Sequence, residues 1–507
     1  MTAGERTPRR SRGRTSPGPA DPTAVPPVPD AAPEPAAATA RPRRRARTAP
    51  ARTPAPVRSA DEIGRTAQGP RPVPELSPPR PVRPPTLRQE VLGSGLTVVA
   101  VRKPGVPLVE VRLRVPFGGR SPEHAARAEV LAATVLLGTG TRSRSQVDAE
   151  LAAVGGHLDA RVDPQRLLLT GSVLSSGLPV LLDVLADSLT DPRYGREDVA
   201  GERDRIGEHL AMAASQPSVV AREKLQQLRF GDHPAALDNP DAGLVAAVTP
   251  AVVRNLHRRA VLPAGSVLVL VGDLRPADAV RRVADALGGW TPAGPARTLA
   301  VPPAVTGGPV HAFHRDGAVQ SQVRLTAAAV DRTHEDYPAV QLANLVYGGY
   351  FSSRLVENIR EDKGYTYSAH SSLEFWPGRA AVTIGFDTAT ASTAAALLEA
   401  RYELGRLALV PPKDAEVEAA RQYALGTLAT SLSTQAGYAS TLSALLGFGL
   451  EPGWLQRHAA RLAAVTPGEV ARAAATVFAP SAATGVVVGD LQAVGAQLSA
   501  LGDVVLP

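Results

Sequence analysis

An internal duplication constrains the fold of this 507-residue chain more than any other feature. The tripeptide Val-Thr-Pro occurs at residues 248–250 and again at 465–467, and Gly-Asp-Leu occurs at 272–274 and at 489–491. Both pairs are offset by 217 residues, so the spacing within the two copies is identical. In each copy, the first tripeptide begins a helical pattern that leads through a proline to an apolar strand. Because solenoid units are only about 20–50 residues long, this repeat indicates two homologous domains.

The start of the first copy reads as strands followed by a buried helix. Residues 96–101 (LTVVAV) are mostly apolar and strand-like, and residues 109–115 alternate apolar and polar side chains as a half-buried strand does. A helix is expected over 122–137; its later part is apolar nearly all round, and the Gly-Thr-Gly at 138–140 ends it. Near the front of each copy the tripeptide Val-Arg-Leu also recurs. These patterns indicate that each domain combines strands with helices.

The predicted domains are residues 87–296 and 297–507, joined near the Pro- and Gly-containing stretch 291–295. Before them, residues 1–86 are rich in Pro, Ala and Arg and poor in aromatic and β-branched residues, which predicts a disordered tail. Residues up to 90 hold 17 Arg against 8 Asp and Glu, so the net charge of +7 belongs to the tail. The arginine-rich run 41–47 lacks interleaved aromatic residues, and we expect no nucleic-acid partner.

The composition excludes several classes of protein. Cysteine is absent, so disulfide bonds and cysteine-ligated metal sites are ruled out. The longest apolar runs, such as 267–271, are far shorter than the roughly 18 residues of a membrane span. No apolar segment follows the N-terminal arginines as a secretory signal requires. We expect a cytoplasmic protein without a membrane partner.

Residues 348–368 of the second copy, GGYFSSRLVENIREDKGYTYS, form the most specific motif. The paired glycines predict a turn, and either of the following two serines is a potential helix cap. Leu355 and Ile359 predict an inward stripe on the helix, which Gly364 ends before a strand. The Pro-Gly at 377–378 then predicts a hairpin between two strands.

This motif and the two-domain layout closely resemble peptidases of the pitrilysin/insulinase (inverzincin) family, and the resemblance extends over roughly residues 87–507. In that family an Arg and a Tyr seven residues later face the catalytic zinc, and Arg360 and Tyr367 match the pair. The resemblance implies an α+β fold, in which each of two homologous domains combines an antiparallel sheet with helices. It also implies that Gly348, Gly349 and Tyr365 contact a peptide substrate.

Arg360 and Tyr367 suit a site that stabilises negative charge. Peptide hydrolysis builds charge on the carbonyl oxygen, and preorganised donors contribute several kcal/mol to its stabilisation. Arg360 supplies a permanent positive charge, and Tyr367 supplies a neutral hydroxyl donor. The alternative is a surface role, in which Arg360 pairs with Glu361 or Glu357 and Tyr367 merely packs.

Zinc-binding family members carry H-x-x-E-H on the early helix of the first domain, with two His ligands and a Glu base. Aligned on the Gly-Thr that ends the helix, this chain has Glu129, Ala132 and Ala133 at those positions. A shift of two residues gives Leu131, Thr134 and Val135 instead. Neither set forms a metal site, because Ala offers zinc no lone pair and no Glu stands ready as the base. We therefore expect no metal in this chain and no catalysis by the chain alone.

Other possible ligands are isolated. The family's third ligand, a Glu on a later helix, falls near Glu208 and His209, which we interpret as remnant or surface residues. A relocated site from His124, His157 and His209 is the weaker alternative. The remaining close pair of histidines, at 311 and 314, has strand-like rather than helical surroundings.

Two hypotheses of function follow. In the first, the chain is the non-catalytic subunit of a heterodimeric zinc metalloendopeptidase, and its partner carries H-x-x-E-H and the zinc. Arg360 and Tyr367 then complete the partner's site and bind an unfolded peptide. In the second, the chain is an inert scaffold, like the family's core subunits in larger complexes. The retention of both Arg360 and Tyr367 beside an erased zinc motif favours the first.

Overall fold

The computed structural model describes residues 84–237 and 239–507, all of them within the compact unit Pro81–Pro507. The predicted disordered tail falls almost wholly outside the described residues, as does the arginine-rich run 41–47, and both predictions stay open. Among the described residues, no helix combines the length and apolar character needed to cross a membrane.

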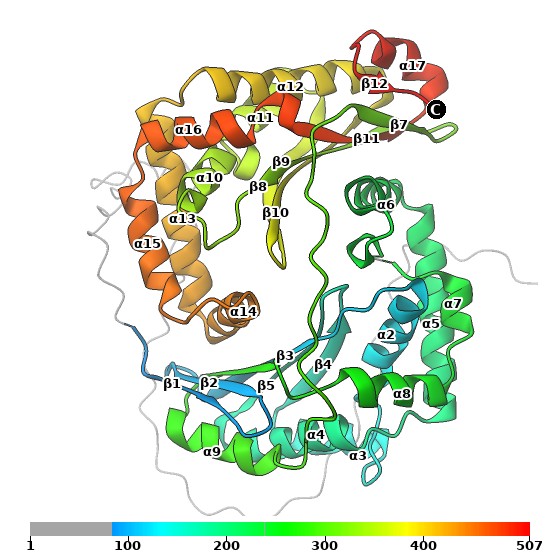
Figure 1. Cartoon of the computed structure of the whole chain (residues 1–507), viewed down its shortest axis with the longest axis vertical. Coiled ribbons are helices and arrows are strands. Elements are labelled where there is room, and N and C mark those ends of the chain that lie inside the picture. The colour runs from blue at the N-terminus through cyan, green and yellow to red at the C-terminus, as the bar shows by residue number, and fades with distance from the viewer. Residues whose placement is uncertain (1–83, 238) are drawn as a thin grey trace, which may run out of the picture. The chain divides into compact units, whose positions relative to one another are not determined.

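The described residues form two six-stranded sheets (Figure 1). The first has the order β1-β2-β6-β3-β5-β4 and the second β12-β7-β11-β8-β10-β9. Strands of the first sheet are β1 (Leu87–Val91), β2 (Thr97–Arg102), β3 (Leu108–Pro116), β4 (His157–Val162), β5 (Arg166–Leu174) and β6 (Val267–Gly272). Strands of the second are β7 (Val310–His314), β8 (Gln320–Ala329), β9 (Thr366–Trp376), β10 (Arg379–Ala389), β11 (Ala483–Gly489) and β12 (Val504–Val505).

The sheet order confirms two homologous α+β domains. Five strands of the second sheet, β7-β11-β8-β10-β9, repeat the order β2-β6-β3-β5-β4 of the first. The pairs β2/β6 and β7/β11 are parallel, while β3 and β8 run antiparallel to their neighbours. Each sheet is therefore mixed rather than purely antiparallel, because the returning strand enters after a long helical crossover. The domain boundary at 296/297 remains a prediction.

Helices cover both sheets. Those of the first half are α2 (Pro122–Thr134), α3 (Arg144–Ala153), α4 (Leu178–Thr190), α5 (Arg196–Ser215), α6 (Pro217–Phe230), α7 (Ala242–Ala246), α8 (Pro250–Ala260) and α9 (Pro276–Ala286). Those of the second half are α10 (Tyr337–Asn344), α11 (Arg354–Val356), α12 (Thr393–Leu409), α13 (Asp414–Ser433), α14 (Gln435–Leu446), α15 (Trp454–Ala464), α16 (Pro467–Val477) and α17 (Leu491–Ser499), with π-helical segments η3 (Leu345–Gly349) and η4 (Glu357–Asp362).

The repeated tripeptides serve the same structural purpose in both halves. Thr249 and Thr466 are the N-caps of α8 and α16, with a proline as the next residue of each helix. Gly272 and Gly489 end β6 and β11, where a Cβ atom would collide with Leu108 and with Ser321 respectively. Helix caps and close contacts between strands thus explain why the two tripeptides recur at the same spacing in both halves.

The repeated Val-Arg-Leu is explained by its arginine. Arg112 of β3 donates to its neighbour's carbonyl and to Gly171 of β5 at 3.0 Å. Arg324 of β8 does the same, donating to Phe386 of β10 at 3.0 Å. Each guanidinium also meets a carboxylate nearby, so its charge is balanced inside the sheet.

Each half covers one face of the other half's sheet. In β2, Ala100 packs into the main core of the first half, whereas Val99 and Val101 face Tyr438 and Leu442 of α14. Successive strand residues point to opposite faces, so the central strands β2 and β6 are buried on both sides. Reciprocally, α6 of the first half packs on β8 and β11 of the second. This exchange fixes the two sheets against each other.

Helix α2 ends at Thr134, three residues before the predicted end. The Thr134 hydroxyl donates to the Val130 carbonyl at 2.5 Å, and the chain continues as a turn up to Gly138, which has a φ of 117°. A hydroxyl that back-bonds to the preceding turn competes with helix propagation.

Candidate functional site

The Arg/Tyr motif lies between α10 and β9 of the second half. The predicted turn at Gly348 and Gly349 is wrong, because both residues close the π-helical segment η3. A Cβ at Gly348 would lie 2.9 Å from the Ser371 hydroxyl, and one at Gly349 would lie 2.8 Å from the Asn344 amide. The two glycines therefore permit close approach of the backbone to its neighbours.

The following helix is built largely as predicted. Ser353 occupies the N-cap position, but its hydroxyl makes no capping bond and is buried without a partner. Leu355 and Ile359 are fully buried in the core of the second half. Gly364, with a φ of 63°, ends the helix, and β9 and β10 then form the predicted hairpin across the Pro-Gly at 377–378.

Arg360 and Tyr367 lie side by side on the surface. The Arg360 guanidinium carbon is 5.4 Å from the centre of the Tyr367 ring and 4.8 Å from that of Phe351. Tyr367 is 88% exposed and Phe351 is 62% exposed, so two aromatic rings and one cation form an open cluster. A cation beside aromatic faces is held electrostatically without losing its outward donors. We call these three residues the cation–aromatic cluster.

The geometry agrees with one part of the surface interpretation and contradicts the other. Arg360 does approach Glu361, with Nε and Oε1 3.4 Å apart, but their side chains are 31% and 49% exposed. Ion pairs this exposed contribute little. Tyr367 does not pack into the protein, since most of its surface is open to solvent. Phe351 was not predicted from the sequence, although it lies within the motif. Only the folded structure shows that its ring is exposed beside Arg360.

The residues expected to contact substrate are partly structural. Gly348 is buried, and Tyr365 is half-buried against the core of the second half. The Tyr365 carbonyl accepts a hydrogen bond from the Thr388 hydroxyl at 2.7 Å, and its N–H donates to Ile359 at 2.9 Å. Substrate contact by Gly348, Gly349 and Tyr365 stays a prediction.

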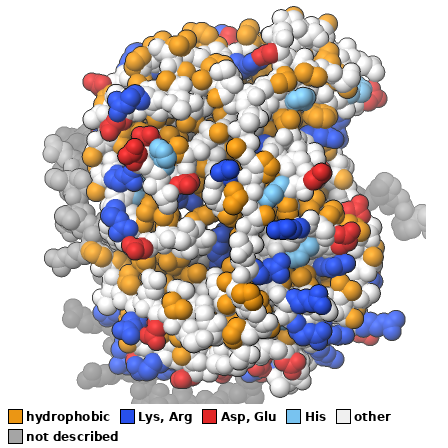
Figure 2. Space-filling view, viewed as in Figure 1, with side chains coloured by type: hydrophobic (Ala, Val, Ile, Leu, Met, Phe, Trp, Pro, Cys, Tyr) orange, Lys and Arg blue, Asp and Glu red, His pale blue; other side chains and the backbone are white. Residues whose placement is uncertain are grey.

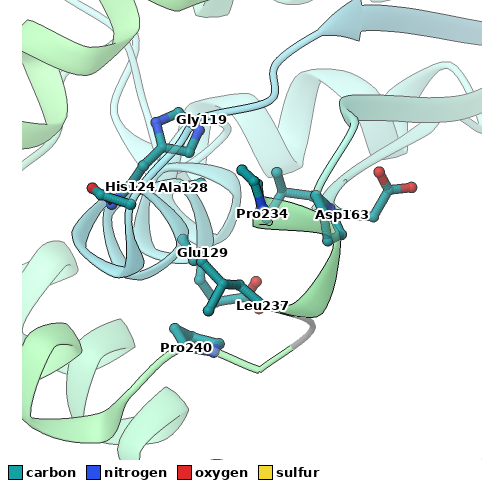
Figure 3. A pocket seen from close by; sticks show the side chains of 12 residues that line it. Gly119, His124, Ala128, Glu129, Asp163, Pro234, Leu237 and Pro240 are labelled. Carbon is teal, nitrogen blue, oxygen red and sulfur yellow. The ribbon is translucent and has the colours of Figure 1, made fainter. Parts of the chain in front are cut away.

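One of the positions matched to the zinc motif, Glu129, lines a pocket of the first half with about 420 Å³ of empty space. One wall is α2, which carries His124, Ala128 and Glu129 (Figure 3). The opposite wall is the segment after α6, which contributes Pro234 and Leu237. The pocket thus presents two carboxylates, one from α2 and one from the turn between β4 and β5, among mostly apolar groups.

The side chains at these positions do not fit a zinc ion. Burial raises the pKa of Glu129, and the nearby charges of His209 and Arg205 offset this only in part. Ala132 is 6% exposed in the core, and Ala133 packs against it. A single carboxylate cannot replace three or four ligands. In the shifted register, Leu131, Thr134 and Val135 are all buried without a free donor atom, since the Thr134 hydroxyl is already bonded.

The other candidate ligands point to separate partners. Glu208 and His209 are exposed on α5. Nε2 of His124 bonds the Phe117 carbonyl at 2.9 Å, and Nδ1 of His157 lies 3.2 Å from the Ser172 hydroxyl. Across residues 84–237 and 239–507, no three His, Asp or Glu side chains are gathered as a metal site requires.

A duplicated α+β domain, with a partly exposed Arg before one edge strand and an exposed Tyr at its start, defines a two-domain peptidase-like protein. The model described as "Insulinase (Peptidase family M16)" matches residues 97–239, and the model "Peptidase M16 inactive domain" matches 247–423. The chain belongs to the insulinase/pitrilysin (M16) peptidase family.

Relatives and solved structures agree with this assignment. An uncharacterised zinc protease of Mycobacterium tuberculosis is 29% identical over 322 residues, covering 62% of this chain and 72% of the relative. Another of Bacillus subtilis is 24% identical over 295 residues, covering 55% and 69%. A peptidase M16 inactive domain from Pseudomonas fluorescens superimposes with a TM-score of 0.73 at 21% identity, over 80% of this chain and 98% of that one. A Helicobacter pylori protease gives 0.73 at 16% identity, over 80% and 99%. These structures establish the fold.

Proposed function

We propose that this chain is the non-catalytic subunit of a heterodimeric zinc metalloendopeptidase. Its partner is a homologous subunit that carries H-x-x-E-H and the zinc ion, and the substrate is an unfolded peptide. Arg360 and Tyr367 act in trans, at the partner's site. On its own the chain is expected to be inactive.

The observation that carries the proposal is the cation–aromatic cluster. A tyrosine that is 88% exposed contributes little to a core, and the Arg360 ion pair is too exposed to stabilise the fold appreciably. Their open donor groups are available to a second molecule instead. In the described part of the chain no three His, Asp or Glu side chains are gathered as zinc requires, and we expect the metal to come from the partner.

The chemistry requires only that the two donors reach a polarised carbonyl oxygen. The partner's zinc would supply the activated water. Arg360 offers up to five N–H donors with a fixed charge, and Tyr367 offers one O–H. Donors aimed at the developing oxyanion stabilise it most where water is excluded, and enclosure between two subunits provides such a place.

The alternative is an inert scaffold of the same family in a larger complex. The extensive exchange of α6 and α14 between the halves makes a rigid body that suits such a role. A scaffold, however, gives no reason for Arg360 to lie beside a Tyr367 that is exposed to solvent.

The test combines the full chain with a family member that carries H-x-x-E-H, taken first from the adjacent reading frame. Bound zinc and cleavage of an unstructured fluorogenic peptide are measured for each chain and for the mixture. We expect cleavage by the mixture alone, and a loss of about 10²–10³-fold in kcat/KM for Arg360→Ala or Tyr367→Phe.

The matched control is Tyr402→Phe, which removes a hydroxyl from a tyrosine that is 57% exposed on α12 and lies outside the cluster. Its mixture should retain full activity. Complex formation by gel filtration separates lost assembly from lost chemistry. If the complex forms and cleaves at the same rate with Arg360→Ala, the scaffold hypothesis replaces the proposed one.

A cytoplasmic location is part of the proposal. A chain without cysteine needs no oxidising compartment to fold. Cell fractionation with an antibody to the chain tests this directly.

A further inference from the structure

A second cavity lies beside the pocket at α2 and has no assigned role. It has about 630 Å³ of empty space, part of it open to solvent. Its walls come from the loop after β3, the start of the inter-domain segment and the β9–β10 turn, with further contacts from the residues that follow α6. The two cavities share Gly119, Pro164 and Pro234. We call this cavity the linker pocket.

The linker pocket is lined by basic groups and by no carboxylate. Arg120, Arg297 and His233 line it, and none of its lining residues is Asp or Glu. Arg297 donates to the Gly118 carbonyl at 2.7 Å and forms no ion pair in the described part of the chain. Burial lowers the pKa of Arg297, with no neighbouring acid to offset it. A half-buried guanidinium without a counter-charge favours an anionic ligand.

His233 adds a donor of fixed orientation. Its Nδ1 accepts the Ala235 N–H at 3.1 Å, so the proton of the neutral ring is on Nε2. That Nε2 is buried and has no hydrogen-bond partner. Burial also lowers the pKa of His233, which keeps the ring neutral. Buried polar atoms without partners are rare in native proteins, and a ligand oxygen would satisfy this one.

A second buried polar atom lies on the same pocket. Oε1 of Gln165 is buried without a partner, and rotation of its amide would present N–H instead. Together with His233 and Arg297, it offers donors from three different segments. Converging donors are the usual means of fixing a carboxylate or phosphate.

The rest of the pocket is apolar. Leu299 and Pro302 line it, together with Trp376. The Trp376 ring is held by Phe230, whose ring centre is 5.1 Å away, and by the Arg229 guanidinium at 4.6 Å. A rigid aromatic wall beside oxyanion donors suits a ligand with one charged end and an apolar body.

The surrounding surface is also basic. Figure 2 shows Lys and Arg side chains gathered over the region where α2 and α8 lie in Figure 1. Arg254, Arg258 and Arg259 are exposed on α8. A field of one sign attracts ligands of the opposite charge.

We infer that the linker pocket binds an oxyanion, and that its ligand is the free C-terminal carboxylate of a peptide whose last side chain packs against Trp376. Free phosphate shares the oxyanion chemistry but leaves the apolar wall uncovered. The inference needs neither a partner subunit nor Arg360 and Tyr367, so it stands or falls separately from the proposed function.

The test uses the full chain alone, with isothermal titration of three probes. These are N-acetyl-Ala-Leu with a free carboxylate, the same dipeptide as its C-terminal amide, and inorganic phosphate. We expect the acid to bind at least about 10-fold more tightly than the amide, because a charge-assisted hydrogen bond is lost. Arg297→Gln should weaken binding of the acid by about 10–100-fold, and Arg297→Lys should weaken it less.

The control is Arg281→Gln, which removes the same charge from an exposed arginine of α9 that does not line the pocket. Its binding should match the unaltered chain. Thermal unfolding checks that each variant is folded, and Arg297→Lys keeps the test valid if Arg297→Gln does not fold. Equal affinity for acid and amide, binding of phosphate alone, or no response to either Arg297 variant would overturn the inference.

Discussion

Arg229 links the two halves through an ion pair, and its replacement should loosen them. Its side chain is 1% exposed on α6, and it forms an ion pair with Glu374 of β9 at 2.8 Å. It also donates to the Thr383 hydroxyl at 3.1 Å and lies 4.6 Å from the centre of the Trp376 ring. Arg229→Met keeps most of the volume and removes these interactions together with the hydrogen bond that Arg229 donates to Gln226.

The expected cost is about 3 kcal/mol. Breaking a fully buried ion pair costs about 3–5 kcal/mol, mostly because the remaining charge is left unpaired. Glu374 is 36% exposed, so water can solvate part of its charge and the cost falls at the lower end. The matched control is Arg281→Met, whose ion pair with Asp278 has an arginine that is 70% exposed. It should cost less than about 0.5 kcal/mol.

Urea unfolding, followed by circular dichroism, measures the total loss. Hydrogen exchange then locates it: protection should fall first in α6 and in β8, which α6 covers, while α4 in the core of the first half should be unaffected. If Arg229→Met and Arg281→Met lose the same stability, burial of this pair does not hold the halves together and the reasoning fails.

Two further predictions concern stability. Burial lowers the pKa of His458 to about 4, with Arg461 and Arg332 adding to the effect. The pKa of His458 in the folded state lies below the unfolded value of about 6.5. The contribution of the neutral ring to the free energy of unfolding is therefore fully present above pH 6.5 and is lost as the pH falls to about 4. The loss amounts to about 3 kcal/mol, and His458→Phe should show a correspondingly flatter dependence of melting temperature on pH. Thr466→Ala should cost about 1 kcal/mol by removing a capping box, whereas Thr249→Ala, which has a single 3.4 Å bond, should cost less; a reversed order in chemical denaturation would contradict the capping argument.

Much of the fold was predictable because its signals are local. The Pro-Gly at 377–378 separates two strand-like runs, and the hairpin between β9 and β10 followed directly. Leu355 and Ile359 are one helical turn apart, and both are buried. The turn expected at Gly348 was wrong because the neighbouring Ser371, which lies on another element, requires the close approach. Such a requirement leaves no trace in the adjacent sequence.

The candidate site was predictable only in part. Arg360 lies at the end of a helix and Tyr367 at the start of the following strand. Because the two elements meet near Gly364, this spacing brings the two side chains together. The third member, Phe351, belongs to the preceding segment, and its place beside Arg360 depends on the η3 geometry. The linker pocket escaped prediction because its walls are contributed by segments more than 200 residues apart.

The sequence by itself determined the duplication, the family, and the absence of the H-x-x-E-H motif, because these depend on residue identity and spacing along one chain. Only the tertiary structure decided that Tyr367 is exposed rather than packed, and that α6 and α14 each pack on the sheet of the other half. The same holds for Arg297 and His233, which line one cavity. The exposure of a side chain, and the meeting of side chains in one cavity, depend on segments that are far apart in the sequence. Packing of the whole chain, rather than any local pattern, sets them.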